Sequence, residues 1–168
     1  MDNENKKIVI VAPHVDDETI GCFTIISKET ENDIFIVYSS SADSTRRDEA
    51  LSLKAKFEKI TAQFFLESIP PPLLNPINVF YFPDPAYEFH PLHRHYGAIG
   101  EQLLRAGFDV TFYSINMQTP YIFEVEDRQR KKELLDEIYP SQKELWNHDH
   151  KYFLFEGHCK WLVKGRLK

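Results

Sequence analysis

The sequence has few cysteines and no long apolar run. Its 168 residues include two cysteines, Cys22 and Cys159, which are too far apart to form a disulfide framework and lack the spacing of a zinc knuckle. The N-terminus is polar, and the apolar run that follows it is too short for a signal-peptide core or a membrane span. These absences favour a cytoplasmic protein in which Cys22 is a small buried residue.

Positive charge is also scarce. The 20 Lys and Arg residues are outnumbered by 26 Asp and Glu, which gives a formal net charge of −6. A protein that follows the phosphates of a nucleic acid carries a basic face, so extended nucleic-acid binding is not expected. A small nucleotide remains compatible with this composition, and nothing in it indicates an oligomeric state.

Hydrophobic residues make up 42% of the chain and charged residues 27%, a balance typical of a globular protein. A chain of this length buries a core without metal or disulfide staples, and no repeat or linker divides it. We therefore expect one domain spanning residues 1–168.

Short runs rich in β-branched and aromatic residues predict five strands, at residues 8–11, 33–39, 62–66, 78–82 and 109–115. Apolar residues at helical spacing predict helices over residues 19–31, 45–59 and 91–106. Strands that alternate with helices in this way predict an α/β sandwich around a parallel sheet.

The remaining segments are less regular. Three consecutive prolines exclude regular structure over residues 69–75. An apolar stripe among many charges predicts a surface helix over residues 124–138, and residues 141–146 predict a further short helix. Residues 152–155, together with Trp161 and Leu162, are expected to pack a terminal element onto the domain.

A polar cluster lies directly after the first predicted strand. His14, Asp16, Asp17 and Glu18 occupy the junction between that strand and the first helix. In an open α/β sheet this junction lies at the carboxyl end of a strand, where ligands bind. One imidazole and several carboxylates at such a position resemble half of a metal site. The same acidic residues also suit the first turn of a helix, so the cluster alone leaves both interpretations open.

Two further clusters follow other predicted strands. Asp43 and Arg46 come after the second strand, and His90 and His93 come after the fourth. Pro91 suits the first position of a helix, which makes His90 the cap and places His93 one turn inside. All three clusters are therefore expected at the same edge of the sheet.

A divalent metal held by His14, Asp17 and His93 would have three protein ligands and one open position. This is the arrangement of a catalytic zinc ion, whereas a structural zinc ion has four protein ligands, usually including thiolates. Zinc is the expected metal, with Fe²⁺ as the alternative.

The segment P-H-V-D-D-E-T-I-G-C at residues 13–22, together with H-P-L-H at residues 90–93, resembles the PIG-L/LmbE-like family of zinc-dependent N-deacetylases. The resemblance spans most of the chain and includes R-R-D-E-A at residues 46–50. It implies a Rossmann-like three-layer sandwich with a mostly parallel sheet. It also implies removal of an acetyl group from a small N-acetylated sugar conjugate of the N-acetylglucosamine type, which releases acetate and a free amine.

The resemblance also implies roles for individual residues. His14, Asp17 and His93 would bind zinc, and Asp16 would be the general base that activates water. His90 would stabilise the oxyanion as a cationic donor.

Other residues would have supporting roles. Arg46 would contact substrate, and Asp43 would either contact substrate or cap the second helix. Glu18 would order the loop. Tyr87 and Phe89 flank the expected site, where their rings could stack on a sugar face.

The chain departs from the family pattern at three points. Val15 replaces a proline, and Phe23 follows Cys22 where the family has a glycine pair. Leu92 replaces the aspartate that would hold and charge the neighbouring His90. His90 therefore needs another partner, for which the candidates are Asp84 and Glu88.

These departures keep two alternatives open. One is a relic of the same fold that holds metal and binds a sugar conjugate without turning it over; the other is a metal-dependent phosphoesterase. The second usually requires two metals and more carboxylates. Four histidines lie outside the clusters: His95, His148, His150 and His158. We interpret them as exposed or packing residues. A metal role is a minor alternative for His148 and His150.

Overall fold

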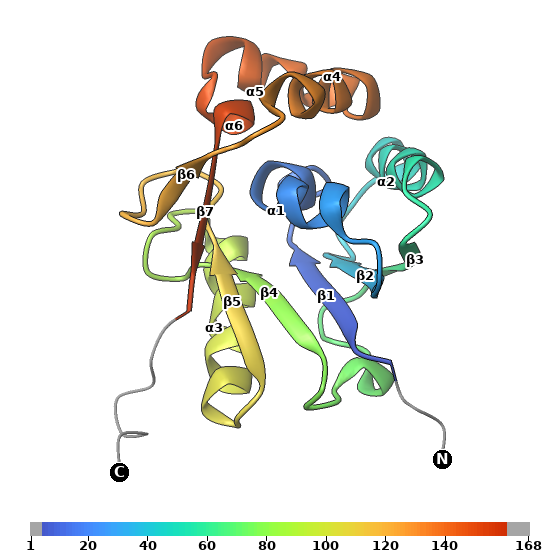
Figure 1. The fold of residues 1–168 in the computed structure, drawn as a ribbon, viewed down its shortest axis with the longest axis vertical. Coiled ribbons are helices and arrows are strands. Elements are labelled where there is room, and N and C mark those ends of the chain that lie inside the picture. The colour runs from blue at the N-terminus through green and yellow to red at the C-terminus, as the bar shows by residue number, and fades with distance from the viewer. Residues whose placement is uncertain (1–4, 161–168) are drawn as a thin grey trace.

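A seven-stranded sheet forms the centre of the molecule (Figure 1), and the computed structural model describes residues 5–160. The strand order is β3-β2-β1-β4-β5-β7-β6. The first five strands are parallel, β7 runs antiparallel to β5, and β6 runs antiparallel to β7. The strands are β1 (Lys7–Ala12), β2 (Asp33–Tyr38), β3 (Ile60–Phe65), β4 (Val79–Pro83), β5 (Asp109–Tyr113), β6 (Ile122–Glu124) and β7 (Phe155–Cys159).

Helices follow three of the parallel strands, and three more lie in the last third of the chain. They are α1 (Asp17–Lys28), α2 (Ser44–Lys56), α3 (Pro91–Arg105), α4 (Arg128–Ile138), α5 (Lys143–His148) and α6 (Lys151–Leu154). Two single 3₁₀ turns, η1 (Pro71–Leu73) and η2 (Pro140–Gln142), complete the list. Figure 1 shows α4, α5 and α6 gathered at one end of the molecule.

The central strands are buried on both faces, which explains their continuous apolar sequences. Side chains alternate along β1, so Ile8 and Ile10 face one layer while Val9 and Val11 face the other. The first layer contains α1, α2 and α4, and the second contains α3 and the proline-rich segment near η1. The expected α/β sandwich with a mostly parallel sheet is therefore confirmed.

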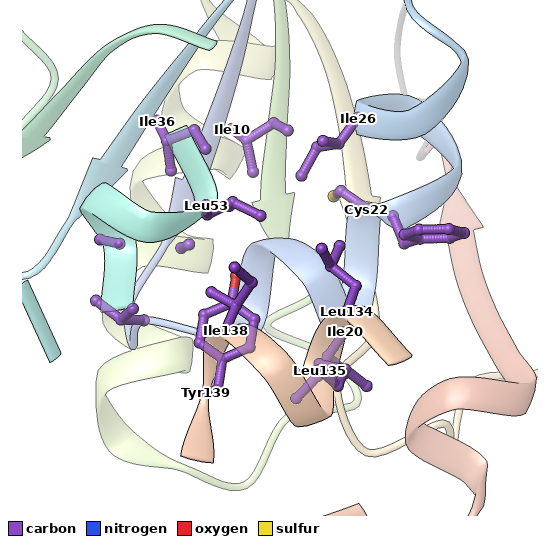
Figure 2. Packing of buried hydrophobic residues seen from close by; sticks show 14 of the residues in the cluster. Ile10, Ile20, Cys22, Ile26, Ile36, Leu53, Leu134, Leu135, Ile138 and Tyr139 are labelled. Atoms are coloured by element: carbon purple, nitrogen blue, oxygen red, sulfur yellow. The ribbon is translucent and has the colours of Figure 1, made fainter. Parts of the chain in front are cut away.

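The larger core lies beneath α4. Figure 2 shows Ile10 and Ile36 of the sheet pointing towards side chains of three helices. The labelled helix residues of this cluster are Ile20, Cys22, Ile26, Leu53, Leu134, Leu135 and Ile138. Burial of so many aliphatic groups at about 1.5–3 kcal/mol each anchors α4 to α1 and α2.

Three expectations about local structure need correction. The segment expected as one helix over residues 124–138 begins with the end of β6, and α4 starts only at Arg128, because Asp127 caps it by accepting the N–H of Arg130. The proline-rich stretch contains the single turn η1, since proline suits the first position of such a turn. Residues 155–159 form β7, which sequence reasoning did not assign as a strand. Trp161 and Leu162 lie outside the described residues.

Helix α1 is interrupted in its middle at Cys22, whose φ of −134° and ψ of 20° are not helical. In a continuous helix the N–H of Thr24 would donate to the carbonyl of Ile20. Instead Thr24 donates to Glu156 Oε1 at 3.0 Å, and the Ile20 carbonyl accepts from Lys131 Nζ at 2.6 Å. The ion pair of Lys131 with Glu156, 3.3 Å apart and fully buried, thus replaces one hydrogen bond of the helix.

Within residues 5–160, we find no helix that is both long and apolar enough to cross a membrane.

Candidate metal centre

The three polar clusters meet where the strand order changes direction. β1 and β4 are neighbours in the sheet, yet β1 leads to α1 on one face and β4 leads to α3 on the other. The loops that leave the two strands therefore diverge, and the carboxyl ends of strands at such a point form the crevice where folds of this kind usually bind ligands. His14 lies on the first loop, and His90 caps the helix that follows the second.

Three donor atoms form a close triangle in this crevice. Asp17 Oδ2 lies 3.4 Å from His14 Nδ1 and 3.0 Å from His93 Nε2, and the two ring nitrogens are 2.9 Å apart. Tetrahedral bonds of about 2.0–2.2 Å would place neighbouring donor atoms about 3.4 Å apart. The triangle is slightly smaller than that spacing, so these residues fit a metal ion after only a small expansion.

His90 belongs to the same group. The ligand atoms of His14, His90 and His93 lie within 4.8 Å of one another, so this set of three imidazoles could hold a metal ion. The rings of His14 and His90 meet edge to face, with centroids 4.6 Å apart. Two overlapping sets therefore share His14 and His93, and the third donor is either Asp17 or His90.

The charges of the triangle support each other. Burial alone would raise the pKa of Asp17, but the neighbouring rings of His93 and His14 hold it below its ordinary value. Burial likewise opposes the charge on His93, but contacts with Asp17 and Glu88 raise the pKa of that ring to about 10. Without metal, this group is therefore an ion pair of an aspartate and an imidazolium.

Glu88 is placed differently from expectation. Its carboxylate contacts His93 Nδ1 at 3.2 Å and accepts the backbone N–H of Ile115 at 2.7 Å. His93 lies one turn inside α3, where its Nδ1 points back to Glu88, so the carboxylate orients a predicted metal ligand and not His90. The other candidate partner of His90, Asp84, is buried and accepts the N–H of Ala86.

His90 itself is exposed and caps α3. Its Nδ1 accepts the N–H of Leu92 at 3.2 Å, which leaves the proton of a neutral ring on Nε2. Partial burial, together with the nearby rings of His14 and His93, lowers the pKa of His90. These contacts favour a neutral donor in place of the cationic one that the resemblance implies.

Asp16 has an unusual backbone. Its φ of 132° lies in a region that only glycine adopts freely, and it precedes α1 without using its side chain as a cap. The carboxylate lies instead 3.1 Å from the Arg46 guanidinium. Burial and the adjacent Asp17 raise the pKa of Asp16, whereas Arg46 opposes that rise.

Glu18 contacts the same loop with a buried carboxylate. It is fully buried, accepts the N–H of Asp16 at 3.0 Å, and accepts the hydroxyl of Tyr139 at 2.6 Å. Burial raises the pKa of Glu18 to about 7, and the hydrogen bonds from Tyr139 and Asp16 limit the rise. Glu18 thus connects the backbone of Asp16 to the hydroxyl of Tyr139.

Helix α2, which follows the second strand, supplies Arg46, but the charge of this arginine is already paired. The guanidinium contacts Asp16 as described, Glu49 Oε2 at 2.7 Å and Ser141 Oγ at 3.0 Å. Asp43 caps α2 by accepting the N–H of Arg46 at 2.9 Å. Capping is one of the two roles expected for Asp43, and a contact with substrate is the other. Sequence reasoning missed Glu49 and Ser141; the three-residue spacing between Arg46 and Glu49 on a helix was the one available signal.

Comparison with known proteins finds a similarity in fold. No family model and no curated protein matches the sequence. The crystal structure of GalB, the 4-carboxy-2-hydroxymuconate hydratase from Pseudomonas putida KT2440, is similar in fold, with a TM-score of 0.54 and 13% sequence identity. The similarity covers 98% of this chain and 100% of that one. At this identity it establishes a shared α/β fold, and the neighbour that shares it is an enzyme.

Proposed function

We propose that the protein is a zinc-dependent N-deacetylase that acts on a small N-acetylated amino sugar, or on a conjugate of the N-acetylglucosamine type. The observation that carries this proposal is the pairing of two features at one crevice. The first is the donor triangle of His14, Asp17 and His93. The second is the separate carboxylate of Asp16, which a purely structural metal site would not require.

The reaction needs a base, a donor for developing negative charge and a proton for the leaving amine. When bound, a zinc ion in this cluster supplies a Lewis acid. Asp16 accepts a proton from the attacking water, whose oxygen bonds to the acetyl carbon. The Nε2–H of His90 donates to the developing oxyanion. Asp16 then passes the proton to the amine as the C–N bond breaks, which leaves acetate and the free amino sugar.

The environment of Asp16 suits this double role. A general base works best when its pKa lies near the operating pH, and burial shifts the pKa of Asp16 upwards from that of an exposed aspartate. The contact with Arg46 fixes the orientation of the carboxylate. Its strained backbone is of the kind that persists at functional sites when the surroundings hold it in place.

Hydration, the activity named for GalB, is the rival reaction. A substrate that carries carboxylates, as that name specifies, requires cationic groups to hold it. Arg46, the arginine next to Asp16, is already paired with Asp16 and Glu49. The charges around the crevice therefore favour the deacetylase.

The test measures acetate release from a panel of N-acetylglucosamine conjugates by the zinc-loaded protein and by Asp16→Asn, with zinc content determined for both. We expect Asp16→Asn to retain zinc and to lose activity about 10²–10⁴-fold, because the base is lost while the three donors of the triangle are kept. His95→Ala is the control, since His95 is an exposed histidine of α3, the helix that carries His93.

Zinc-loaded protein that releases no acetate from any conjugate would contradict the proposal and favour a binding relic. Asp16→Asn with undiminished turnover would remove Asp16 from the reaction. Parallel assays with a phosphate monoester and with a muconate would identify a phosphoesterase or a hydratase.

A further inference from the structure

A pocket of about 300 Å³ lies at α5 and α6, and neither the metal cluster nor the proposed reaction uses it. Its walls include the polar side chains of Ser141 and Gln142 and the larger surfaces of Leu145 and Tyr152. Leu145 is 42% exposed, although it is a large aliphatic residue. The pocket is large enough for a group of about one sugar ring, since ligand sites begin near this volume.

Ser141 connects the pocket to the crevice. Its Oγ lies 3.0 Å from Arg46 Nη1, and Arg46 Nη2 lies 3.1 Å from Asp16 Oδ2. One side chain, Arg46, thus separates the wall of the pocket from the proposed base.

The charged groups around the pocket are balanced or negative. Arg46 is held by two carboxylates, Asp16 and Glu49. Lys151 is paired with Asp149 at 2.9 Å. Glu144 is 87% exposed at the rim, where it contacts the ring of His148. A phosphate in this pocket would therefore meet carboxylates whose cations are already engaged.

We propose that this pocket binds the part of the substrate attached to the acetylated sugar, and that it takes an uncharged or cationic polar group and rejects a phosphate. The inference rests on the proposed function, since it names the substrate class of the same site. Ser141 and Gln142 offer hydrogen bonds to hydroxyl groups, and Leu145 and Tyr152 offer an apolar face to a ring.

The experiment compares three probes that differ only at carbon 1 of N-acetylglucosamine: the methyl glycoside, the 2-aminoethyl glycoside and the 1-phosphate. Dissociation constants are measured by calorimetry on wild-type protein stripped of zinc, so that binding is separated from turnover while Asp16 still holds Arg46. We expect the 1-phosphate to bind at least about tenfold more weakly than the other two, which corresponds to about 1.4 kcal/mol. Acetate release by the wild-type protein is measured with the same three probes.

A charge reversal at the rim provides the specific test. Glu144→Lys is expected to shift the ratio of the phosphate and methyl glycoside dissociation constants about tenfold in favour of phosphate. The control is Glu101→Lys, which makes the same change of charge on the exposed face of α3 and should leave the ratio unchanged.

Each outcome bears on one claim. Equal or tighter binding of the 1-phosphate, or a ratio that Glu144→Lys leaves unchanged, would overturn the inference about the pocket. The expected order of binding without acetate release would support the pocket and contradict the deacetylase. Failure of all three probes to bind would overturn the assignment of the pocket to this site.

Discussion

Asp16 combines a strained backbone with a side chain that the proposed reaction needs. A non-glycine residue in such a conformation costs about 1–3 kcal/mol, and the contacts of Asp16 with Glu18 and Arg46 keep it there. Asp16 is the N-cap residue of α1, but in this conformation its carboxylate does not accept a hydrogen bond from the backbone of its own helix, as an N-cap aspartate usually does.

Removal of this strain should be measurable. Asp16→Gly and Asp16→Ala both lose the carboxylate, but only the alanine variant keeps the Cβ that disfavours a φ of 132°. We expect Asp16→Gly to be more stable than Asp16→Ala by about 1 kcal/mol in urea unfolding, with neither variant active. Equal stability of the two would show that the backbone at this position carries no strain.

Gly21 is required for a different reason, the close approach of an aromatic ring. A Cβ at this position would lie 2.2 Å from Cδ2 of Tyr113, a fully buried residue whose hydroxyl donates to the carbonyl of Val11. We expect Gly21→Ala to lower the free energy of unfolding by about 1–3 kcal/mol, because the ring cannot move aside without losing that bond. Ser52→Ala, on the exposed face of α2, should change it by less than about 0.5 kcal/mol.

At the scale of elements, the buried pair of Lys131 and Glu156 joins α4 and β7 to the broken helix α1. Lys131 Nζ contacts the carbonyls of Ile20 and Phe155 as well as the carboxylate. Removal of one member leaves the other charged group buried and alone, which typically costs 3–5 kcal/mol. We expect a loss of about this size in Lys131→Met. In Lys132→Met, which breaks a partly exposed pair on the same helix, we expect at most about 1 kcal/mol.

The pair should also make stability depend on pH. Burial lowers the pKa of Lys131 to about 8, although Glu156 opposes the shift. Between about pH 8 and the ordinary pKa of lysine, the unfolded chain therefore binds a proton that the folded protein has lost, so folding becomes more favourable as pH rises. Urea unfolding at pH 7 and pH 9.5 should show wild type gaining stability relative to Lys131→Met. If the difference in stability between wild type and Lys131→Met narrowed over this interval, the lowered pKa of Lys131 would be refuted. The other titratable groups beside the pair are Cys22 and His158.

The sequence predicted the parallel elements well and the last third poorly. Strands such as β1 and β2 are continuous apolar runs closed by polar loops, so local composition is sufficient to find them. β6 and β7 were missed because β6 is exposed along its length and β7 contains the buried Glu156 and Gly157, whose environment depends on distant residues. No local pattern reveals that the carboxylate of Glu156 accepts a backbone N–H at the break in α1.

The candidate site shows the same division. The positions of His14, Asp17 and His93 could be predicted, since each lies at the end of a parallel strand or at the start of the helix after it. The partners of Arg46 and Glu88 could not, because the choice among several carboxylates is made by packing in three dimensions.

For the whole molecule, the donor cluster links loops that are far apart in the sequence, so an ion bound there should stabilise the entire fold. We expect zinc at about 100 times its dissociation constant to add about 2.7 kcal/mol and to raise the melting temperature, with reversal by a chelator. His93→Ala should abolish most of this increase, and His95→Ala should retain it. An increase that survives in His93→Ala would place the bound zinc elsewhere.

The break in α1 makes one amine an internal reporter of opening motions. Lys131 Nζ is enclosed, donates to three acceptors and cannot meet an acylating reagent while the protein stays closed. Exposed lysines such as Lys54 will be modified at once, whereas modification of Lys131 must wait until α4 separates from α1. The rate at which Lys131 is labelled, followed by mass spectrometry, would therefore report how often α4 separates from α1.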